Sequence, residues 1–346
     1  MKKFFVTSLL ATFFAMCGAG TAVAASWRVN SNTAMSADFA DVNAAMSDER
    51  VVAGDTLYID PGTNISTNQE ITKRVTIVGP GYLHQGTPIQ SAVFSCIVYI
   101  REAAAGTKIE GCVLSTSYVY GANSILERNY IKGNVDLRAK YVTVHANYIE
   151  FNSSSSYISG GKDYLGTVIT NNIFKITSRG PAISSSYNAT ISNNVIVYSN
   201  SYEYRMIGSV YNSVITNNIF IDTYNASRAY FSLSLSNNNV IENNVTSCSA
   251  DDTNWADYPN NTFLGSNDLT AIFDTTGIAD RYYRLCENSP AKGAGVNGSD
   301  CGAYAGDSYV PSGLPLFYPY FTRVEIPSVT TDGKLNIKLN IKTQNE

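Results

Sequence analysis

A repeated five-residue pattern constrains the fold of this chain more than any other feature. The pattern is an aliphatic residue, two further residues, a fourth residue that is usually asparagine, and then an apolar residue. It occurs seven times, and its fourth residue is, in order, Cys112, Asn129, Asn147, Asn172, Asn194, Asn218 and Asn244. Copies that follow one another every 17 to 26 residues indicate a solenoid, in which each repeat is one coil stacked on the next.

The residue types inside each repeat predict strands and not helices. Leucine-rich repeats have a similar period, but they need several leucines per repeat and a helical return, whereas this chain offers valine, isoleucine, tyrosine and asparagine. One coil is predicted from strands at 135–137, 141–144 and 148–151, with a corner at Asn147. The first strands of later coils are expected near 157–159, 182–184, 205–208 and 229–233. We therefore expect an all-β fold, a single-stranded right-handed parallel β-helix.

The repeated asparagines have a structural interpretation. The short turn between two strands of a coil requires a residue in the left-handed conformation, which asparagine tolerates better than most residues. Stacked on successive coils, their side-chain amides can hydrogen-bond along the axis as a ladder. We expect these asparagines to hold the coils together and to take no part in chemistry.

The two ends of the chain break the repeat. Phe39, Val42, Ala45 and Met46 lie at helical spacing and predict a short amphipathic helix that caps the N-terminal end. Strands are expected at 56–60 and within 75–81. The repeat fades after Cys248, and alternating residues at 335–342 predict one half-buried strand. The expected organisation is a signal peptide at 1–24, the β-helix with its cap at 25–310, and a C-terminal tail with a closing strand at 311–346.

The first residues predict export. Lys2 and Lys3 precede an apolar run at 4–16 and the small-residue triplet Ala22-Val23-Ala24, so cleavage after Ala24 is expected. The run is shorter than the ~20 residues of a spanning helix, and no membrane insertion is expected after cleavage. Lipidation at Cys17 is an alternative. The mature protein is expected to be secreted, periplasmic or at the cell surface.

Charge and cysteine content exclude two classes of function. The formal charge of −4 becomes −6 when the first 24 residues, with two lysines and no acid, are removed. An acidic chain argues against a nucleic-acid partner, because phosphates need a basic surface. The sequence contains no CxxC pair, so it signals neither a zinc site nor a redox site. Most of the remaining cysteines are expected to be small buried side chains, with a Cys96–Cys112 or Cys286–Cys301 bridge as an alternative.

Several segments support a family resemblance. They are 53–59, 61–63, 76–82, the Asn-Asn-Ile-Phe repeats, 289–295, 300–304 and 312–315. With them, the chain resembles the secreted pectate-lyase-like right-handed β-helix proteins common in Bacteroides and its relatives, over almost the whole mature chain. The resemblance implies a pectin-lyase-like solenoid. It leaves the activity open, because the superfamily includes polysaccharide lyases, hydrolases, esterases and exported β-helices without an assigned reaction.

No motif decides whether the protein is an enzyme. A calcium-dependent uronate lyase needs clustered carboxylates for the metal and a basic residue to take the proton. The candidates near the first strands are Asp136, Arg138, Asp163 and Arg205, but their acids fall on separate coils. The paired aspartates and Gly-His-Gly of polygalacturonases and the signature of pectin esterases are missing. We expect no metal or cofactor, with calcium only if the protein is a lyase.

A binding face is the remaining candidate site. Outward residues of successive coils come ~4.8 Å apart, a ladder suited to an extended polymer. The candidate glycan contacts are Tyr120, Tyr157, Lys162, Tyr204, Arg228 and Tyr230, since aromatic faces stack on sugars and cations pair with uronates. Tyrosines that simply cover a β surface are the plainer alternative. The chain is expected to be a monomer that binds an extended polysaccharide without established catalysis. The alternatives are a polysaccharide lyase or glycoside hydrolase acting on a uronate-containing glycan, and a structural or adhesive surface protein.

Overall fold

The structure is a computed structural model of the 346-residue chain. It describes residues 24–82, 90–201, 205–228, 231–232, 238–255, 257–258, 260–277, 279–307, 309–314, 320–325, 334 and 337–342. The expected signal peptide lies outside these residues except for Ala24. The described chain is mostly β, and nearly all of its strands run in parallel sheets. None of its helices is long and apolar enough to span a membrane.

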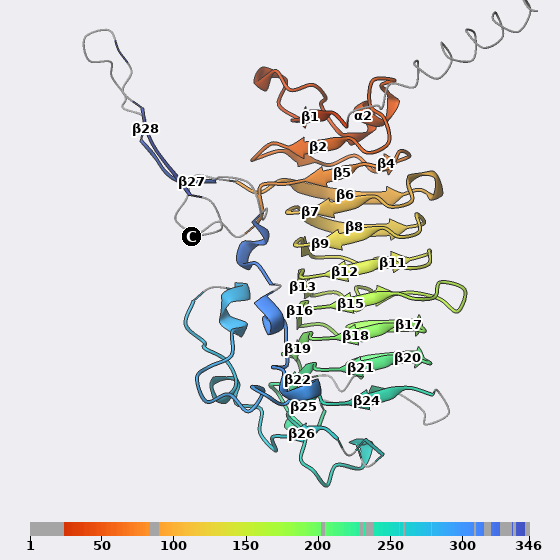
Figure 1. Cartoon of the computed structure of the whole chain (residues 1–346), viewed down its shortest axis with the longest axis vertical. Helices are drawn as coiled ribbons and strands as arrows, with labels where there is room; N and C mark the ends of the chain where they lie inside the picture. The colour runs from red at the N-terminus through yellow and green to blue at the C-terminus, as the bar shows by residue number, and fades with distance from the viewer. Residues whose placement is uncertain are drawn as a thin grey trace, which may run out of the picture.

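One sheet collects a short strand from each coil (Figure 1). Its ten parallel strands are β1 (Ser26–Val29), β2 (Thr56–Ile59), β5 (Thr76–Val78), β7 (Lys108–Glu110), β9 (Ile125–Glu127), β12 (Thr143–His145), β15 (Val168–Thr170), β18 (Thr190–Ser192), β21 (Val214–Thr216) and β24 (Val240–Glu242). The middle residue of most of these strands is apolar and points inward. Leu126, Val144 and Ile169, for example, lie in register on adjacent strands and are fully buried.

A second sheet of 16 strands has two arms, because β6 (Val93–Ile100) and β8 (Val113–Val119) each bend and contribute to both. The first arm continues through β3 (Asn64–Ile65), β10 (Tyr130–Ile131), β13 (Tyr148–Phe151), β16 (Ile173–Ile176), β19 (Val195–Tyr198), β22 (Ile219–Asp222), β25 (Val245–Thr246) and β26 (Thr262–Phe263). The second arm continues through β4 (Gln69–Ile71), β11 (Val135–Leu137), β14 (Ile158–Ser159), β17 (Ile183–Tyr187), β20 (Ile207–Tyr211) and β23 (Phe231–Ser232). The ten-stranded sheet and the two arms share one hydrophobic core, as in a β-helix-like solenoid.

The predicted coil agrees closely with these strands. Strands β11 and β13 have the bounds expected from the sequence, while the strand expected from residue 141 begins at Thr143. It starts late because Tyr141 has a φ of 59°, which ends extended backbone. Near the N-terminus, helix α2 (Val42–Ser47) begins after Asp41, whose side chain accepts a hydrogen bond from the Ala44 amide at 2.8 Å.

The asparagine ladder is confirmed, with one correction. Each side-chain amide donates to the next asparagine's Oδ1 along Asn129, Asn147, Asn172, Asn194, Asn218, Asn244 and Asn261, over 2.9 to 3.3 Å. The prediction that these asparagines adopt the left-handed conformation is wrong. The positive φ falls one residue earlier, at Gly111, Arg128, Ala146, Asn171, Asn193, Asn217 and Asn243. The side chain of each ladder asparagine points inward instead. There its amide bonds to backbone N–H and C=O groups of the corners, as Asn129 does with the Ile109 carbonyl.

A C-terminal segment covers the outer face of the first arm, and we call its described residues within 264–314 the cover. It contains the 3₁₀ helices η6 (Leu269–Ala271), η7 (Ala279–Tyr283), η8 (Val296–Gly298), η9 (Ala305–Asp307) and η10 (Pro311–Gly313). Its apolar side chains, such as Ile272, Phe273 and Tyr283, form a second hydrophobic cluster with outward residues of the arm. In Figure 1 the cover runs in blue beside β13, β16 and β19.

The last strand is not half-buried as expected. β28 (Lys338–Lys342) pairs in antiparallel fashion with β27 (Tyr320–Glu325). Leu339 is 48% exposed, and Lys338 and Asn340 beside it are exposed as well, so neither face of this described stretch is buried. The prediction is wrong because alternating apolar and polar residues form a buried face only where another surface packs against the apolar side.

The five cysteines in the described part of the chain form no disulfide. Cys96, Cys112, Cys248 and Cys301 are buried and Cys286 is partly exposed, which confirms small buried side chains for most of them. Burial raises the pKa of the Cys96 and Cys248 thiols to about 11, so these thiols are poor nucleophiles at neutral pH. Neither of the two bridges considered from the sequence is present.

Candidate functional site

The outward face of the second arm carries a ladder of side chains in register. From strand to strand the ladder is Glu70, Tyr99, Tyr118, Asp136, Ser159, Ser184 and Gly208. It changes from aromatic and charged residues near the N-terminal end to serine and glycine further along. The cover packs on the first arm, so it does not account for the aromatic residues here.

Seven residues at the N-terminal end of this ladder form what we call the tyrosine–arginine cluster: Glu70, Tyr99, Arg101, Tyr118, Tyr120, Asp136 and Arg138. The rings of Tyr99 and Tyr118 are stacked, with centroids 5.4 Å apart and planes 15° apart. The Arg101 guanidinium lies 4.5 Å from the centroid of Tyr99 and 5.4 Å from that of Tyr120. These contacts hold the rings in fixed positions on the surface.

Arg138 binds the other side of the cluster. Its guanidinium lies 5.1 Å from the Tyr118 centroid, and its Nη1 donates to the Tyr120 hydroxyl at 3.1 Å. The same group forms an ion pair with Asp136 at 2.7 Å, and Arg101 pairs likewise with Glu70. Hydrogen bonds to these acids raise the pKa of both guanidinium groups. The cluster therefore presents partly exposed rings beside two permanently charged donors.

A second pair of tyrosines lies further along the same arm. The rings of Tyr187 and Tyr211 are in register on β17 and β20, with centroids 4.6 Å apart and planes 11° apart. The same two strands carry the small ladder residues Ser184 and Gly208, and a residue with positive φ, Ser185 or Ser209, separates them from the tyrosines. The second arm thus carries a second aromatic pair beside the small residues of the ladder.

The structure brings together three of the residues predicted from the sequence, namely Tyr120, Asp136 and Arg138. Tyr157 is half-buried and packs against the hydrophobic core. Lys162 and Asp163 are exposed in the turn before β15, and neither forms an ion pair with another described residue. Arg205 is exposed just before β20. Tyr204, Tyr230 and the side chain of Arg228 lie outside the described residues.

Sequence reasoning missed Glu70, Tyr99 and Arg101. A signal was present, because the segments Val98-Tyr-Ile-Arg101, Ser117-Tyr-Val-Tyr120 and Val135-Asp-Leu-Arg138 share the same alternation. Aligned as strands, they place two polar or aromatic residues outward on each of three coils. The coil at residues 93–100 lacks the asparagine pattern, so the repeat does not reveal its register with the next coils.

A second charged group lies on the ten-stranded sheet, and we call it the acid–base cluster: Lys108, Glu110, Glu127, Arg128 and His145. Glu110, Glu127 and His145 are in register on adjacent strands. Lys108 reaches both carboxylates, at 2.9 Å and 2.6 Å, and Arg128 also pairs with both. Every acid in this cluster is thus paired with two cations.

Arg128 occupies an unusual backbone position. It takes the left-handed corner with a φ of 52°, where other coils have glycine, alanine or asparagine. A non-glycine residue there costs about 1 to 2 kcal/mol. Only 4% of the side chain is exposed, so its pairs with Glu110 and Glu127 are largely shielded from water. The strain is offset by these two charge-assisted contacts.

His145 adds a neutral partner to this cluster. Its Nδ1 lies 3.0 Å from the Thr170 Oγ1 on the next strand. Burial lowers the pKa of His145, so the ring is neutral at neutral pH. Within the described residues, no group of three or more histidines, cysteines and acids could hold a metal ion.

A buried aspartate holds the cover together where the cover meets the solenoid. The Asp280 side chain in η7 is fully buried, and its Oδ2 accepts from the Ser312 amide at 2.5 Å and from the Tyr309 hydroxyl at 3.4 Å. Tyr309 in turn contacts the Tyr82 hydroxyl at 3.0 Å. Burial raises the pKa of Asp280. The folded cover therefore binds this proton more tightly than the unfolded chain does.

The stability of the cover should fall as pH rises above 4. Because the folded pKa of Asp280 is raised, its contribution is full below the unfolded value near 3.9 and is lost as pH passes the folded value. Asp280→Asn should remove this slope. Urea unfolding between pH 4 and 7, followed by tyrosine fluorescence, measures it in both proteins. Equal slopes of stability against pH in the parent and in Asp280→Asn would contradict the role given to Asp280. The neighbouring Tyr82, Tyr304 and Tyr309 do not titrate in this range, because burial raises their pKa values.

No protein-family model, curated protein or solved structure matches this chain. What the site can bind therefore follows only from the chemistry of its own side chains. Those side chains offer stacked aromatic rings and paired arginines on an open strand face, and a fully paired set of charges on the ten-stranded sheet.

Proposed function

We propose that the protein is an exported right-handed parallel β-helix of the pectate-lyase-like type that binds an extended polysaccharide along its second arm. In this proposal residues 25–310 form the β-helix with α2 as its N-terminal cap, and residues 311–346 form a tail whose first residues, 311–314, complete the cover. The mature chain acts as a monomer that is secreted, periplasmic or at the cell surface. No cofactor is required for binding.

The tyrosine–arginine cluster carries this proposal. Rings that are stacked and held by guanidinium groups lose little freedom when a ligand covers them, so binding costs less entropy. Tyrosine offers a flat apolar face and a hydroxyl, which suits a sugar ring with its axial hydrogens and hydroxyls. The ladder spacing of ~4.8 Å lets one polymer touch several coils in succession. The Tyr187–Tyr211 pair, displaced from the ladder along β17 and β20, supplies a second aromatic contact on the same arm.

The charges of the cluster favour an acidic polysaccharide. A guanidinium has five N–H donors, and the pairs with Glu70 and Asp136 engage only part of them. Arg101 and Arg138 can therefore still donate to a uronate carboxylate. Both acids of the cluster are already bound by arginine, which supports binding without catalysis.

The acid–base cluster supports the enzyme alternative. Two carboxylates on adjacent strands, with a lysine, an arginine and a histidine beside them, are the residue types of a polysaccharide lyase or hydrolase. Each acid is paired, however, and a catalytic role would require the substrate to displace one of those pairs. Product formation is the observation that would favour this function over binding alone.

Removing the stacked rings should abolish most glycan binding. The double variant Tyr99→Ser/Tyr118→Ser should bind an acidic polysaccharide at least about tenfold more weakly than the parent, because two stacking contacts are lost. Arg138→Gln should weaken binding of acidic glycans more than of neutral ones. Binding is measured on a panel of acidic and neutral polysaccharides with residues 25–346.

Tyr224→Ser is the matched control, since Tyr224 is a tyrosine on another corner and is 61% exposed. Undiminished binding by the double variant would refute the second arm as the site. Each bound glycan is also followed for new reducing ends and for unsaturated products, with and without calcium. A product signal that disappears in Glu127→Gln would replace the binding function with catalysis at the acid–base cluster.

A further inference from the structure

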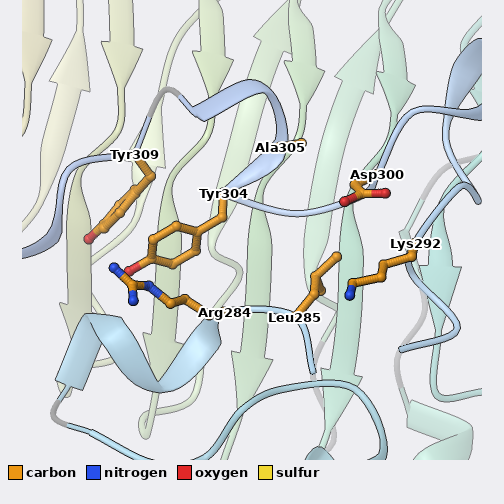
Figure 2. A pocket seen from close by; sticks show the side chains of 7 residues that line it. All are labelled: Arg284, Leu285, Lys292, Asp300, Tyr304, Ala305 and Tyr309. Carbon is orange, nitrogen blue, oxygen red and sulfur yellow. The ribbon is translucent and has the colours of Figure 1, made fainter. Parts of the chain in front are cut away.

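The cover contains a pocket that the proposed glycan face does not use. It has a volume of about 370 Å³ and is lined by Arg284, Leu285, Lys292, Asp300, Tyr304, Ala305 and Tyr309. Figure 2 shows Tyr304, Tyr309 and Arg284 at one end, Lys292 and Asp300 at the other, and Leu285 between them. Its size is in the lower part of the range of small-ligand sites, which start at about 300 Å³.

The walls of this pocket are fixed by hydrogen bonds to the solenoid and to each other. The left-handed corner residue Asn171 donates through its side chain to the carbonyls of Ala303 and Ala305, at 3.0 Å and 3.1 Å. The Gly302 amide donates to the carbonyl of Asn217, another corner residue, at 2.9 Å. The backbone of this wall is therefore preformed, and a ligand has to order only the exposed side chains of Arg284 and Lys292.

The pocket concentrates positive charge that lacks an acidic partner. Arg284 and Lys292 form no ion pair with any acid of the described chain, whereas seven other cations there do. The Arg284 guanidinium lies 5.4 Å from the Tyr304 centroid, and Lys292 donates to the Glu287 carbonyl at 3.0 Å. The carboxylate of Asp300 accepts from the Gly293 amide at 3.0 Å. With Asp300 in the same lining, the cavity keeps one net positive charge on an acidic protein, which favours an anionic ligand.

We propose that this pocket binds a hydroxylated carboxylate about the size of one acidic sugar. A carboxylate at the Arg284 end can accept two parallel N–H bonds from the guanidinium. Tyr304 and Leu285 offer apolar surface to the body of the ligand. Asp300 and Lys292, an acceptor and a donor, match hydroxyl groups at the far end. The pocket lies on the cover and the tyrosine–arginine cluster on the second arm, so loss of one site leaves the other intact.

Calorimetric titration of residues 25–346 with glucuronate, glucose and inorganic phosphate tests the proposal. Glucuronate should bind with one site per chain, and glucose should bind at least about tenfold more weakly because it has no carboxylate. Arg284→Gln and Lys292→Gln should each weaken glucuronate binding by a similar factor. Arg179→Gln is the control, since Arg179 is an exposed arginine outside the pocket.

Three outcomes would overturn the proposal. No saturable glucuronate binding would show that the pocket is not a site for this ligand class. Phosphate that binds as tightly as glucuronate would show that the pocket selects charge alone. An equal loss in Arg179→Gln would show that net charge and not the pocket governs binding. Unchanged polysaccharide binding in Arg284→Gln separates this site from the one on the second arm.

Discussion

Asn194→Ala should lower the free energy of unfolding by about 4 kcal/mol. The Oδ1 of Asn194 accepts from the backbone and side-chain amides of Asn172, both at 3.0 Å, and its Nδ2 donates to three acceptors, among them Asn218 at 2.9 Å. All three asparagines are fully buried. Alanine would leave the backbone N–H of Asn172 unsatisfied in the interior and would remove the amide that donates to the Ile169 carbonyl, the Ser192 carbonyl and Asn218. Each unsatisfied group costs about 1 to 3 kcal/mol.

The measurement is urea unfolding by circular dichroism, with Thr190→Ala as the control. Thr190 lies exposed on β18 of the same coil, so its truncation should change stability by less than about 0.5 kcal/mol. Since Asn194 is in the middle of the stack, its loss should also divide the transition into two, because each coil is stabilised by its neighbours. A single transition with an unchanged midpoint would refute a stabilising role for the ladder.

Tyr82→Ala should release the cover from the solenoid. Tyr82 is fully buried, its amide donates to the Ser312 carbonyl at 2.7 Å, and its ring lies 5.8 Å from Tyr130 and 6.5 Å from Tyr148. Truncating a buried aromatic side chain costs about 3 to 5 kcal/mol. The backbone bond to Ser312 is kept, but the lost ring packs between Gly313 of η10 and the first arm, so the cover should open while the parallel sheets remain.

Limited proteolysis measures this release as faster cleavage within residues 279–309, and circular dichroism reports the sheets. Tyr82→Phe is the matched control, since it keeps the ring and loses only the hydroxyl contact with Tyr309, worth about 1 kcal/mol. Cleavage of Tyr82→Ala at the parent rate would show that the cover is held mainly elsewhere. Simultaneous loss of the sheets would show that cover and solenoid unfold as one unit.

The strands of the coils could be predicted because their signals are local and repeated. Each copy of the pattern supplies an inward aliphatic residue, a corner and a ladder asparagine, so an error in one coil is corrected by the next. The left-handed residue could not be assigned with the same accuracy. Asn171 and Asn172 are adjacent and identical in type, and only the backbone shows that the first has the positive φ while the second turns inward.

The candidate site was predicted only in part. Three of its residues, Tyr120, Asp136 and Arg138, lie on coils in which inward and outward residues alternate clearly in the sequence. Their partners Tyr99 and Arg101 come from a coil without the asparagine pattern. The pairing of each acid with its arginine was also not predictable, because it depends on side-chain conformations across strands. The sequence did contain a signal for the cover. Strand β19 is a continuous apolar run, and its four residues, Val195, Ile196, Val197 and Tyr198, are all buried. Such runs are typical of strands buried on both faces.

The sequence by itself determined the stack of coils, the inward aliphatic residues and the asparagine ladder, because each depends on contacts between neighbouring repeats of one period. The tertiary structure decided which outer face is covered, which tyrosines and arginines meet, and where the pocket of the cover lies. Those features join residues as distant as Tyr82 and Tyr309. Contacts of this kind have no period, since they depend on how a non-repeating segment of about fifty residues folds back on the outside of the stack.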